Sequence, residues 1–276
     1  MTEAALQTSP AVTSSDVAKG AATTLLARLG AVMEVIAQPI YVWMFGLASY
    51  GLYAVLWAAV NLAENVTDLG MASSMQRVVP KARSPQEQVS ALRSAMILGI
   101  GPCLILAAVA SLGAAQYAHL FNTAASDSAW LVSIVSLFAW SLPLWAFVEI
   151  ATSALRSKRV FGAEIRLRIF WEQVIRLIVT TILWFAGFST MSLFYAHLIS
   201  LTIICLLCVR LLARHFELRL IFRGRLFDPV FHETWKAGLS VLPANMVARL
   251  LGDGPSLVLN WVLPGSAGAV SGGLYS

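Results

Sequence analysis

Charged and amide side chains recur at helical spacing within two strongly apolar stretches, residues 50–71 and 237–262. Their offsets are i, i+3, i+4 and i+7 in the first stretch and i, i+4 and i+8 in the second, so each set shares one helix face. The sets are Asn61, Glu64, Asn65 and Asp68, and Asn245, Arg249 and Asp253, the second continued by Ser256 and Asn260. Because an ionised side chain at mid-bilayer costs about 2.5–3.5 kcal/mol, such residues usually face a protein interior or a wet cavity. The two stripes therefore predict a cavity that holds ions or a charged substrate.

A second interpretation of these stripes is hydrogen bonding between neighbouring helices, which holds a bundle together. Asp68, and likewise Glu149 in residues 129–153, lies near the end of its apolar stretch. A carboxylate at such a position can cap a helix or reach water. The number of ionisable groups at depth favours the cavity over packing alone.

Residues 22–45 carry two further ionisable candidates, Arg28 and Glu34. Glu34 shares a helix face with Gln38 and Tyr41, which follow it at i+4 and i+7. Arg28 lies about two turns from the end of the stretch, so its long side chain can also extend to the lipid headgroups. Both interpretations of Arg28 stay open.

The remaining titratable residues form no catalytic or metal-binding pattern. The three cysteines lie in apolar stretches without a CxxC pair, so we interpret them as packing residues. Glu172 and Arg176 are four residues apart and are expected to neutralise each other. His197 is expected to hydrogen-bond a neighbouring helix. We expect no metal site and no cofactor.

The composition fixes the environment of the chain. Hydrophobic residues make up 58% of its 276 residues and charged residues only 12%, with a mean hydropathy of +0.76. A soluble domain cannot carry this composition, so the lipid bilayer must be the solvent. The net charge of +5 does not indicate nucleic-acid binding, because the basic residues fall in short blocks between apolar stretches.

A membrane-spanning helix needs about 20 mostly apolar residues. The sequence offers seven such stretches and no strand pattern, at residues 22–45, 50–71, 94–116, 129–153, 169–187, 191–209 and 237–262. Internal prolines are expected to kink three of them, at Pro39, Pro102 and Pro143. The sequence thus predicts an all-α, polytopic transmembrane helix bundle.

The basic residues predict the orientation of the bundle. Three longer connections hold most of the nineteen Lys and Arg residues, and three short ones hold none. The longer connections are 72–93, 154–168 and 210–236, and the short ones are 46–49, 117–128 and 188–190. Since Lys and Arg in short loops mark the cytoplasmic side, we expect a multi-pass inner-membrane protein with a cytoplasmic N-terminus. The basic connections are expected to carry amphipathic helices that contact anionic lipid headgroups, with partner binding as the alternative.

Short motifs recur in the same order near both ends of the chain. The first copies are Lys19-Gly20, Ala27-Arg28-Leu29-Gly30, Gly46 and Gly51-Leu52-Tyr53, and the second are Lys236-Ala-Gly238, Ala248-Arg249-Leu250-Leu251-Gly252, Gly265 and Gly273-Leu274-Tyr275. Parallel repeats of several helices are a transporter architecture. We expect four parts: a disordered cytoplasmic tail at 1–21, a six-helix first lobe at 22–209, a basic cytoplasmic linker at 210–236, and the incomplete start of a second lobe at 237–276. Such a chain is expected to be a fragment or a truncated product.

Several of these motifs also suggest a family. They are Lys19-Gly20, the turn Gly46–Tyr53 with its Tyr50-Gly51-Leu52-Tyr53, Asp68-Leu69-Gly70-Met71 followed by Arg77, and Asp253 in the repeat. In this order they resemble the polysaccharide-exporter branch of the multidrug/oligosaccharidyl-lipid/polysaccharide exporter superfamily, the branch of the O-antigen flippases. The resemblance covers nearly the whole chain and rests on the order of the motifs rather than on any one of them.

The resemblance implies a MATE-like fold, in which two six-helix lobes surround a cavity that opens alternately to the two membrane faces. It implies that an undecaprenyl-pyrophosphate-linked sugar moves from the cytoplasmic to the outer leaflet. This chain, with about seven spans, is expected to lack most of the second wall of that cavity.

The resemblance also suggests roles for the polar residues. Arg28 and Arg249 are the candidates to bind the pyrophosphate, because a guanidinium holds phosphate oxygens in a planar fork. The candidates to bind a coupling ion, H⁺ or Na⁺, are Glu34, Glu64, Asp68 and Asp253, in a cavity that Asn61, Asn65 and Asn245 also line.

Two other functions fit part of the sequence. A cation-coupled multidrug exporter of the same fold would favour acidic and aromatic residues over arginine in its cavity. A membrane glycan polymerase, ligase or glycosyltransferase would need a sizeable outer loop, and the largest, 117–128, offers only His119 and Asp127 for chemistry. We therefore expect a transporter of membrane lipid-linked oligosaccharides and not an enzyme.

Overall fold

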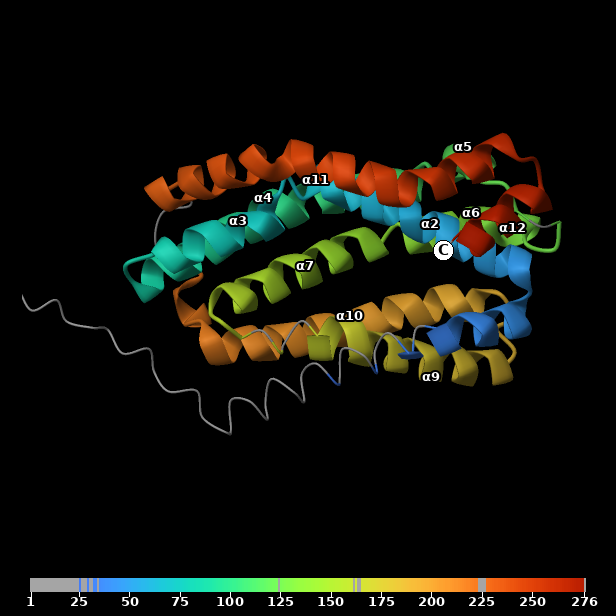
Figure 1. Ribbon diagram of the computed structural model, residues 1–276, viewed down its shortest axis with the longest axis horizontal. Coiled ribbons are helices and arrows are strands. Elements are labelled where there is room, and N and C mark those ends of the chain that lie inside the picture. The colour runs from blue at the N-terminus through green and yellow to red at the C-terminus, as the bar shows by residue number, and fades with distance from the viewer. Residues whose placement is uncertain are drawn as a thin grey trace, which may run out of the picture.

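The computed structural model describes residues 25, 29, 32, 33, 35–123, 125–160, 162, 165–222 and 227–275. In these residues the chain folds into an elongated bundle of helices without a strand (Figure 1). The all-α prediction is therefore confirmed. Arg28 and Glu34 lie outside the described residues, as do the expected N-terminal tail, Lys19-Gly20 and all of Ala27–Gly30 except Leu29.

The principal helices follow the order of the predicted spans. They are Val35–Phe45, α2 (Leu47–Thr67), α3 (Met71–Val78), α4 (Pro85–Leu112), α5 (Ala114–Tyr117), α6 (Leu131–Phe138), α7 (Ser141–Ser157), α9 (Glu172–Phe185), α10 (Met191–His215), α11 (Pro229–Val262) and α12 (Ser266–Tyr275). Short 3₁₀ segments are η1 (Val79–Lys81), η2 (Ala118–Leu120), η3 (Ser128–Trp130) and η5 (Leu218–Leu220), and a π-helical segment, η4 (Ile165–Trp171), runs directly into α9.

Two helices begin well before the apolar stretches that predicted them. α4 starts at Pro85, because the Ser84 hydroxyl accepts a hydrogen bond from the Glu87 N–H (3.2 Å) and Glu87 accepts one from the Arg83 N–H (2.6 Å). This arrangement is a variant of the capping box, in which the glutamate accepts from the residue before the N-cap instead of from the N-cap itself. α11 starts at Pro229, where Asp228 accepts from the Phe231 N–H at 2.8 Å. The sequence prediction placed the polar first turns of both helices in the connections, because hydropathy alone does not identify a helix cap.

A sharp turn separates α2 from α3, inside the end of the predicted span 50–71 and just before the expected basic loop. Leu69 and Gly70 have positive φ angles of 54° and 74°. A Cβ on Gly70 would lie 2.4 Å from the Gly238 carbonyl oxygen, so α11 crosses this turn in close backbone contact. Glycine is required at both positions of the crossing. Much of the expected 72–93 loop is thus helical, as α3 and the start of α4.

The predicted span at 129–153 is divided in two. α6 ends at Phe138 and α7 begins at Ser141, with the break at Ala139 and Trp140. Pro143 has no N–H to donate to the carbonyl of residue 139, which accounts for an interruption there. α4, in contrast, continues through Pro102.

The last helix, α12, brings the two copies of the sequence repeat together. It packs along α2 (Figure 1), and a Cβ on Gly51 would lie only 1.7 Å from the Ala269 carbonyl oxygen. A Cβ on Gly273 would lie 3.1 Å from the Gly51 Cα. Gly51 and Gly273 are equivalent residues of the repeat, so the two copies meet through their small residues.

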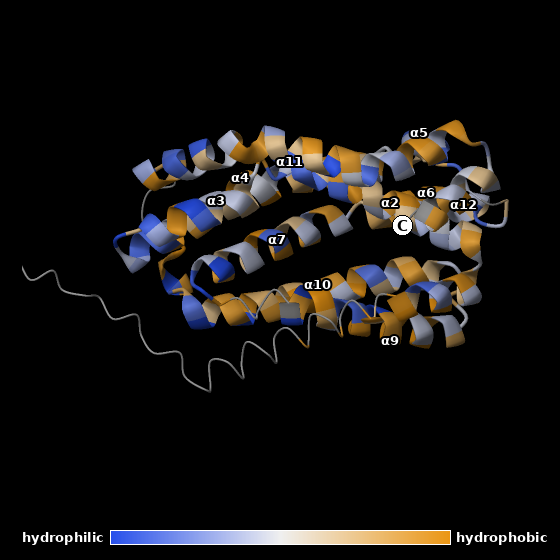
Figure 2. Ribbon diagram, in the orientation of Figure 1, coloured by the Kyte–Doolittle hydropathy of each residue, from blue (hydrophilic) through white to orange (hydrophobic). Residues whose placement is uncertain are grey.

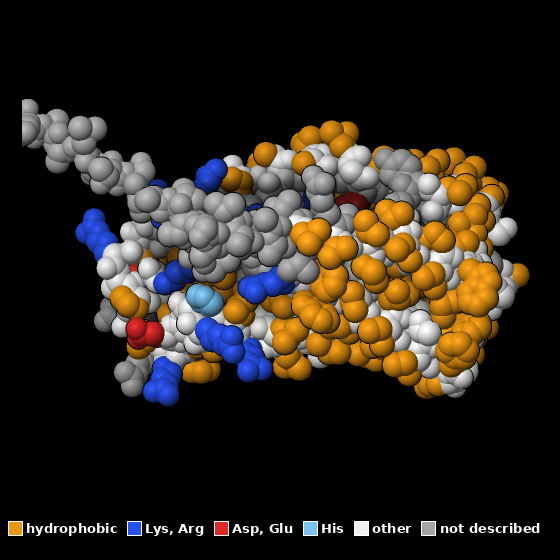
Figure 3. All heavy atoms as spheres, turned by 60° about the horizontal axis from the view of Figure 1, so that its bottom comes forward, with side chains coloured by type: hydrophobic (Ala, Val, Ile, Leu, Met, Phe, Trp, Pro, Cys, Tyr) orange, Lys and Arg blue, Asp and Glu red, His pale blue; other side chains and the backbone are white. Residues whose placement is uncertain are grey.

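Hydropathy divides the bundle along its length. Three helical segments are long and apolar enough to cross a membrane by length and composition among the described residues: Pro85–Leu112, Ser128–Ser157 and Met191–His215. Figure 2 shows hydrophobic residues predominating over much of the bundle and hydrophilic ones concentrated toward one end. On the face in Figure 3, Lys and Arg side chains gather at that end and hydrophobic side chains cover the remainder. The chain has the surface of a membrane protein.

Candidate functional site: a polar cavity between two repeats

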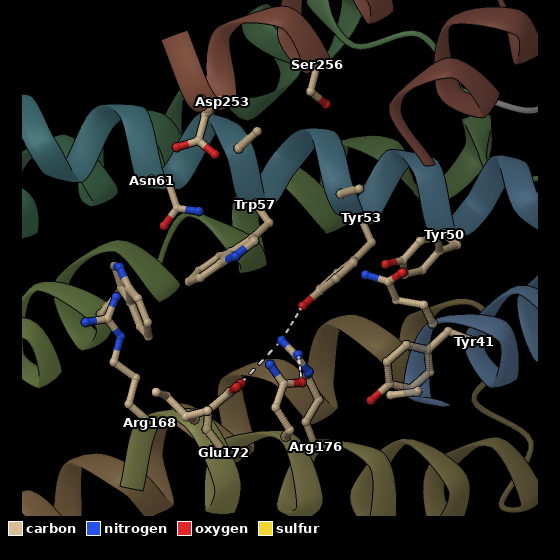
Figure 4. A pocket seen from close by; sticks show the side chains of 18 of the residues that line it. Tyr41, Tyr50, Tyr53, Trp57, Asn61, Arg168, Glu172, Arg176, Asp253 and Ser256 are labelled. Atoms are coloured by element: carbon tan, nitrogen blue, oxygen red, sulfur yellow. Dashed lines mark hydrogen bonds and ion pairs between the residues drawn. The ribbon is translucent and has the colours of Figure 1, made fainter. Parts of the chain in front are cut away.

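A polar cavity of about 440 Å³ lies inside the bundle. The Val35–Phe45 helix and α2 form one side, the η4–α9 segment another, and α11 a third. Figure 4 shows Arg168, Glu172 and Arg176 extending from η4–α9 toward α2, with Asp253 and Ser256 on α11. Helices from both repeat copies therefore contribute to the cavity.

The wall from α2 is aromatic toward one end of the cavity and polar toward the other. Tyr50, Tyr53, Trp57 and Asn61 line it at i, i+3, i+7 and i+11, which is one helix face. Trp57 packs edge-on against Trp145 with their ring centroids 5.0 Å apart. The stripe predicted from Asn61 onward thus extends through three aromatic residues, which a search for charged and amide residues alone does not reveal.

The floor of the cavity is a closed network around Arg176, whose side chain is only 9% exposed. Its guanidinium lies 3.3 Å from the Glu172 carboxylate and donates to the Tyr53 hydroxyl at 2.6 Å and to the Gln173 side chain. The Tyr53 hydroxyl and His197 Nδ1 are 3.1 Å apart. The predicted Glu172–Arg176 pair and the predicted hydrogen bond of His197 are both confirmed, and they belong to one network.

A second charge cluster joins three helical segments beside the cavity. The Glu149 carboxylate on α7 lies 2.6 Å from Arg168 on η4 and 3.8 Å from Arg249 on α11. Arg249 is also 3.8 Å from Asp253, one turn further along α11. The Arg168 guanidinium lies over the Trp145 ring, 4.6 Å from its centroid. Arg168, Arg249 and Asp253 line the cavity, and Glu149 contacts both arginines.

Arg168 corrects the prediction that residues 154–168 form a basic loop. It belongs to the π-helical segment η4, which extends α9 toward the basic end and places the guanidinium in the cavity. Such π segments are often found at functional sites. The signal was present in the sequence, because Arg168, Glu172 and Arg176 are spaced by four residues.

A model of the polysaccharide biosynthesis protein family matches residues 17–276. The chain belongs to this family. Comparisons with curated proteins and with solved structures returned no match. The match covers both copies of the repeat, so the family resemblance includes both helices that carry polar stripes.

Within this polysaccharide biosynthesis protein, the predicted site residues separate into two groups. Asn61, Arg249 and Asp253 line the cavity. Glu64, Asn65 and Asp68 continue the stripe of α2 beyond it, where Glu64 and Asp68 are only 3% and 5% exposed.

Asp68, from the second group, and Asn245, which does not line the cavity, make the local contacts that the alternative interpretation describes. The Asp68 carboxylate accepts from the Ala72 N–H at 3.2 Å, across the α2–α3 turn, and so caps α3. The Asn245 side chain donates to the Ser73 hydroxyl at 3.2 Å, joining α11 to α3. Both interpretations of the polar stripes therefore apply: one part of each stripe lines the cavity, and the next part makes contacts between neighbouring helices.

Proposed function

We propose that this member of the polysaccharide biosynthesis family takes part in moving a lipid-linked oligosaccharide across the inner membrane, with its N-terminus in the cytoplasm. The observation that carries the proposal is the pair of arginines, Arg168 and Arg249, that line one cavity between the two repeat copies and share the carboxylate of Glu149. In this proposal the pyrophosphate of the lipid carrier binds these arginines.

The other cavity arginine is less suited to this role. Arg176 also lines the cavity, but its side chain is almost completely buried and its guanidinium is held by Glu172, Tyr53 and Gln173. Arg249 is about one-third exposed and is held by two carboxylates at 3.8 Å, so its contacts are long and readily exchanged. Arg168 adds a second fork from the opposite wall, and a diphosphate can bridge two guanidiniums as one carboxylate does here. Arg28, the repeat equivalent of Arg249, remains a third candidate.

The sugar is proposed to lie toward the aromatic part of the cavity. Tyr50, Tyr53 and Trp57 offer flat apolar faces with polar edges along one side of α2. A sugar ring presents C–H groups and hydroxyls to such a wall. A site that combines aromatic faces with a few well-placed polar groups is typical of ligand cavities.

The buried carboxylates of α2 are proposed to bind the coupling ion. Among the described residues, no basic side chain lies within ion-pair distance of Glu64 or Asp68. An unpaired carboxylate at such a depth is costly unless it takes up a proton or a cation. Asp253 and, by sequence, Glu34 are the further candidates, with H⁺ or Na⁺ as the ion.

The alternatives receive less support from the same geometry. A multidrug exporter for cations would favour an aromatic and acidic cavity surface. Aromatic residues, Glu172 and Asp253 do line this cavity, but three arginines line it as well and outnumber the two carboxylates. For an outer-loop enzyme, Asp127 would be the general acid or base, yet it is 2% exposed and accepts hydrogen bonds from Ser49 (2.5 Å) and Thr190 (3.2 Å). It joins helix ends in the described chain.

Ligand binding to the purified chain in lipid nanodiscs tests the proposal. We expect a polyprenyl-pyrophosphate-linked sugar to bind more tightly than the corresponding polyprenyl monophosphate, since the second phosphate can engage the second arginine. Ethidium, a planar cation, should not compete with it. Tighter binding of ethidium than of the pyrophosphate lipid would favour the drug exporter and overturn the flippase.

A further inference from the structure

A second basic site lies on the outside of the bundle, between η4–α9 and α10. It is a groove of about 670 Å³ whose lining includes Arg166, Arg210 and Arg214, together with Trp171. None of these residues lines the central cavity, and the groove has no part in the function proposed above. We propose that it binds an anionic phospholipid, with the phosphate on the arginines and the acyl chains along the apolar surface below.

The residues of α10 that line the groove share one helix face. Leu207, Arg210, Leu211 and Arg214 fall at i, i+3, i+4 and i+7. Both arginines are exposed, and in the part of the chain that the structure describes neither makes an ion pair or a side-chain hydrogen bond. No acidic residue lines the groove in the described part of the chain. Among these residues, the two cations have no protein partner that a ligand must displace.

The opposite side of the groove positions a third cation. Arg166 donates through Nε to the Gly162 carbonyl at 3.0 Å, which leaves its two terminal amino groups for a ligand. Trp171 follows on the same segment and is 46% exposed. A tryptophan beside arginines at the end of a spanning helix is typical of the headgroup level of a membrane.

An apolar surface continues from the groove along both helices. On α9, Ile178 and Ile182 are 52% and 61% exposed, and on α10, Leu206 is 66% exposed. Figure 3 shows, on the face that it presents, basic side chains bordering a broad hydrophobic surface. A ligand that satisfies both parts must be anionic at one end and apolar over most of its length, which describes a phospholipid and not a free phosphate or a nucleotide.

The proposal is tested by titrating the purified, delipidated chain in detergent with dioleoylphosphatidylglycerol and following its apparent melting temperature. The chain should be stabilised by this lipid and not by dioleoylphosphatidylcholine or inorganic phosphate. Because both guanidiniums attract the anionic headgroup, we expect the variant Arg210→Gln/Arg214→Gln to bind about 30-fold more weakly. Arg166→Gln/Arg214→Gln, which removes a different pair, should show a comparable loss.

The matched control is Lys81→Gln/Arg83→Gln, which removes two exposed cations between α3 and α4, at the same end of the bundle (Figure 1). Its affinity should stay within about twofold of the wild type if the groove is specific. Equal losses in control and groove variants would show attraction to net charge alone and would overturn the site. The proposal would also be overturned if inorganic phosphate stabilised the protein as much as the lipid does, or if the lipid did not stabilise it.

Discussion

Glu149 on α7 reaches Arg249 on α11, with 3.8 Å between its Oε1 and the arginine Nη2. The same oxygen lies 2.6 Å from Arg168, so one carboxylate on α7 connects η4 with α11. Under the proposed function, an anion that enters the cavity competes with Glu149 for both guanidiniums. An incoming phosphate is suited to replace it, because it offers the same kind of acceptor to both guanidiniums.

Replacing Glu149 with Gln tests both the pairing of Glu149 with the two arginines and its competition with the phosphate. The glutamine fits the same space but removes the charge that the arginines share, so a polyprenyl pyrophosphate should bind more tightly, by roughly tenfold, because it no longer competes with a carboxylate. The unliganded protein should lose about 2 kcal/mol of stability from the weakened pairing, which is below the usual cost of a fully buried pair because Arg249 is partly exposed. Isothermal titration calorimetry measures the change in affinity, and thermal unfolding measures the change in stability. Glu217→Gln, at an exposed position, is the control, and unchanged affinity and stability in E149Q would contradict the assignment.

Replacing Tyr53 with Phe removes one hydroxyl from the buried network below the cavity. That hydroxyl accepts from Arg176 at 2.6 Å and lies 3.1 Å from His197, so its loss should cost about 1–3 kcal/mol. Tyr195→Phe is a matched control, because the hydroxyl of Tyr195 has no hydrogen bond among the described residues. Comparable melting temperatures for Y53F and Y195F would show that the network does not hold the floor of the cavity.

The contact of the two repeat copies predicts that Gly51→Ala is strongly destabilising. Its added methyl would lie 1.7 Å from the Ala269 carbonyl oxygen, so α12 must move away from α2, at a cost of about 1–3 kcal/mol. Gly101→Ala on α4 is the control, because no atom lies within 4 Å of the added carbon there. G101A should be neutral or slightly stabilising in thermal unfolding. A G51A protein as stable as G101A would mean that α12 does not pack on α2 as described.

Asp127 should prove structural. Asp127→Asn weakens the hydrogen bonds from Ser49 and Thr190 at a site that is 2% exposed, and it should lower stability by about 1–3 kcal/mol. The control is Ser128→Ala, whose hydroxyl bonds only the exposed local carbonyl of Ala125. If D127N abolished glycan synthesis in cells without lowering the melting temperature, the enzyme interpretation would be favoured instead.

The fold class and most helix positions could be predicted from the sequence, because membrane-spanning helices are recognisable by their hydropathy. It missed where helices begin, since the caps at Ser84 and Asp228 are polar residues outside the apolar stretches. It also missed the turn at Leu69 and Gly70, whose conformation is stabilised by the crossing of α11 at Gly238. That contact is remote in sequence and has no local signal.

The cavity was predictable in part. Periodicity placed Asn61, Arg249 and Asp253 on the right helix faces, and these residues line it. Arg168 was counted with a loop because positively charged residues near span ends are assigned to connections, whereas η4 continues the helix into that segment. The pairing of Glu149 with two arginines depends on how α7, η4 and α11 pack, which no spacing along the chain encodes.

Binding of a polyprenyl pyrophosphate to the Arg168→Gln/Arg249→Gln variant tests the central claim most directly. In nanodiscs of uncharged lipid, this double variant should lose roughly 30-fold or more in affinity for the pyrophosphate lipid, because two charge-assisted contacts disappear. The Lys81→Gln/Arg83→Gln control, with the same change in net charge outside the cavity, should bind like the wild type. Equal affinity for the cavity variant and the control would show that the anion does not bind between the two repeats.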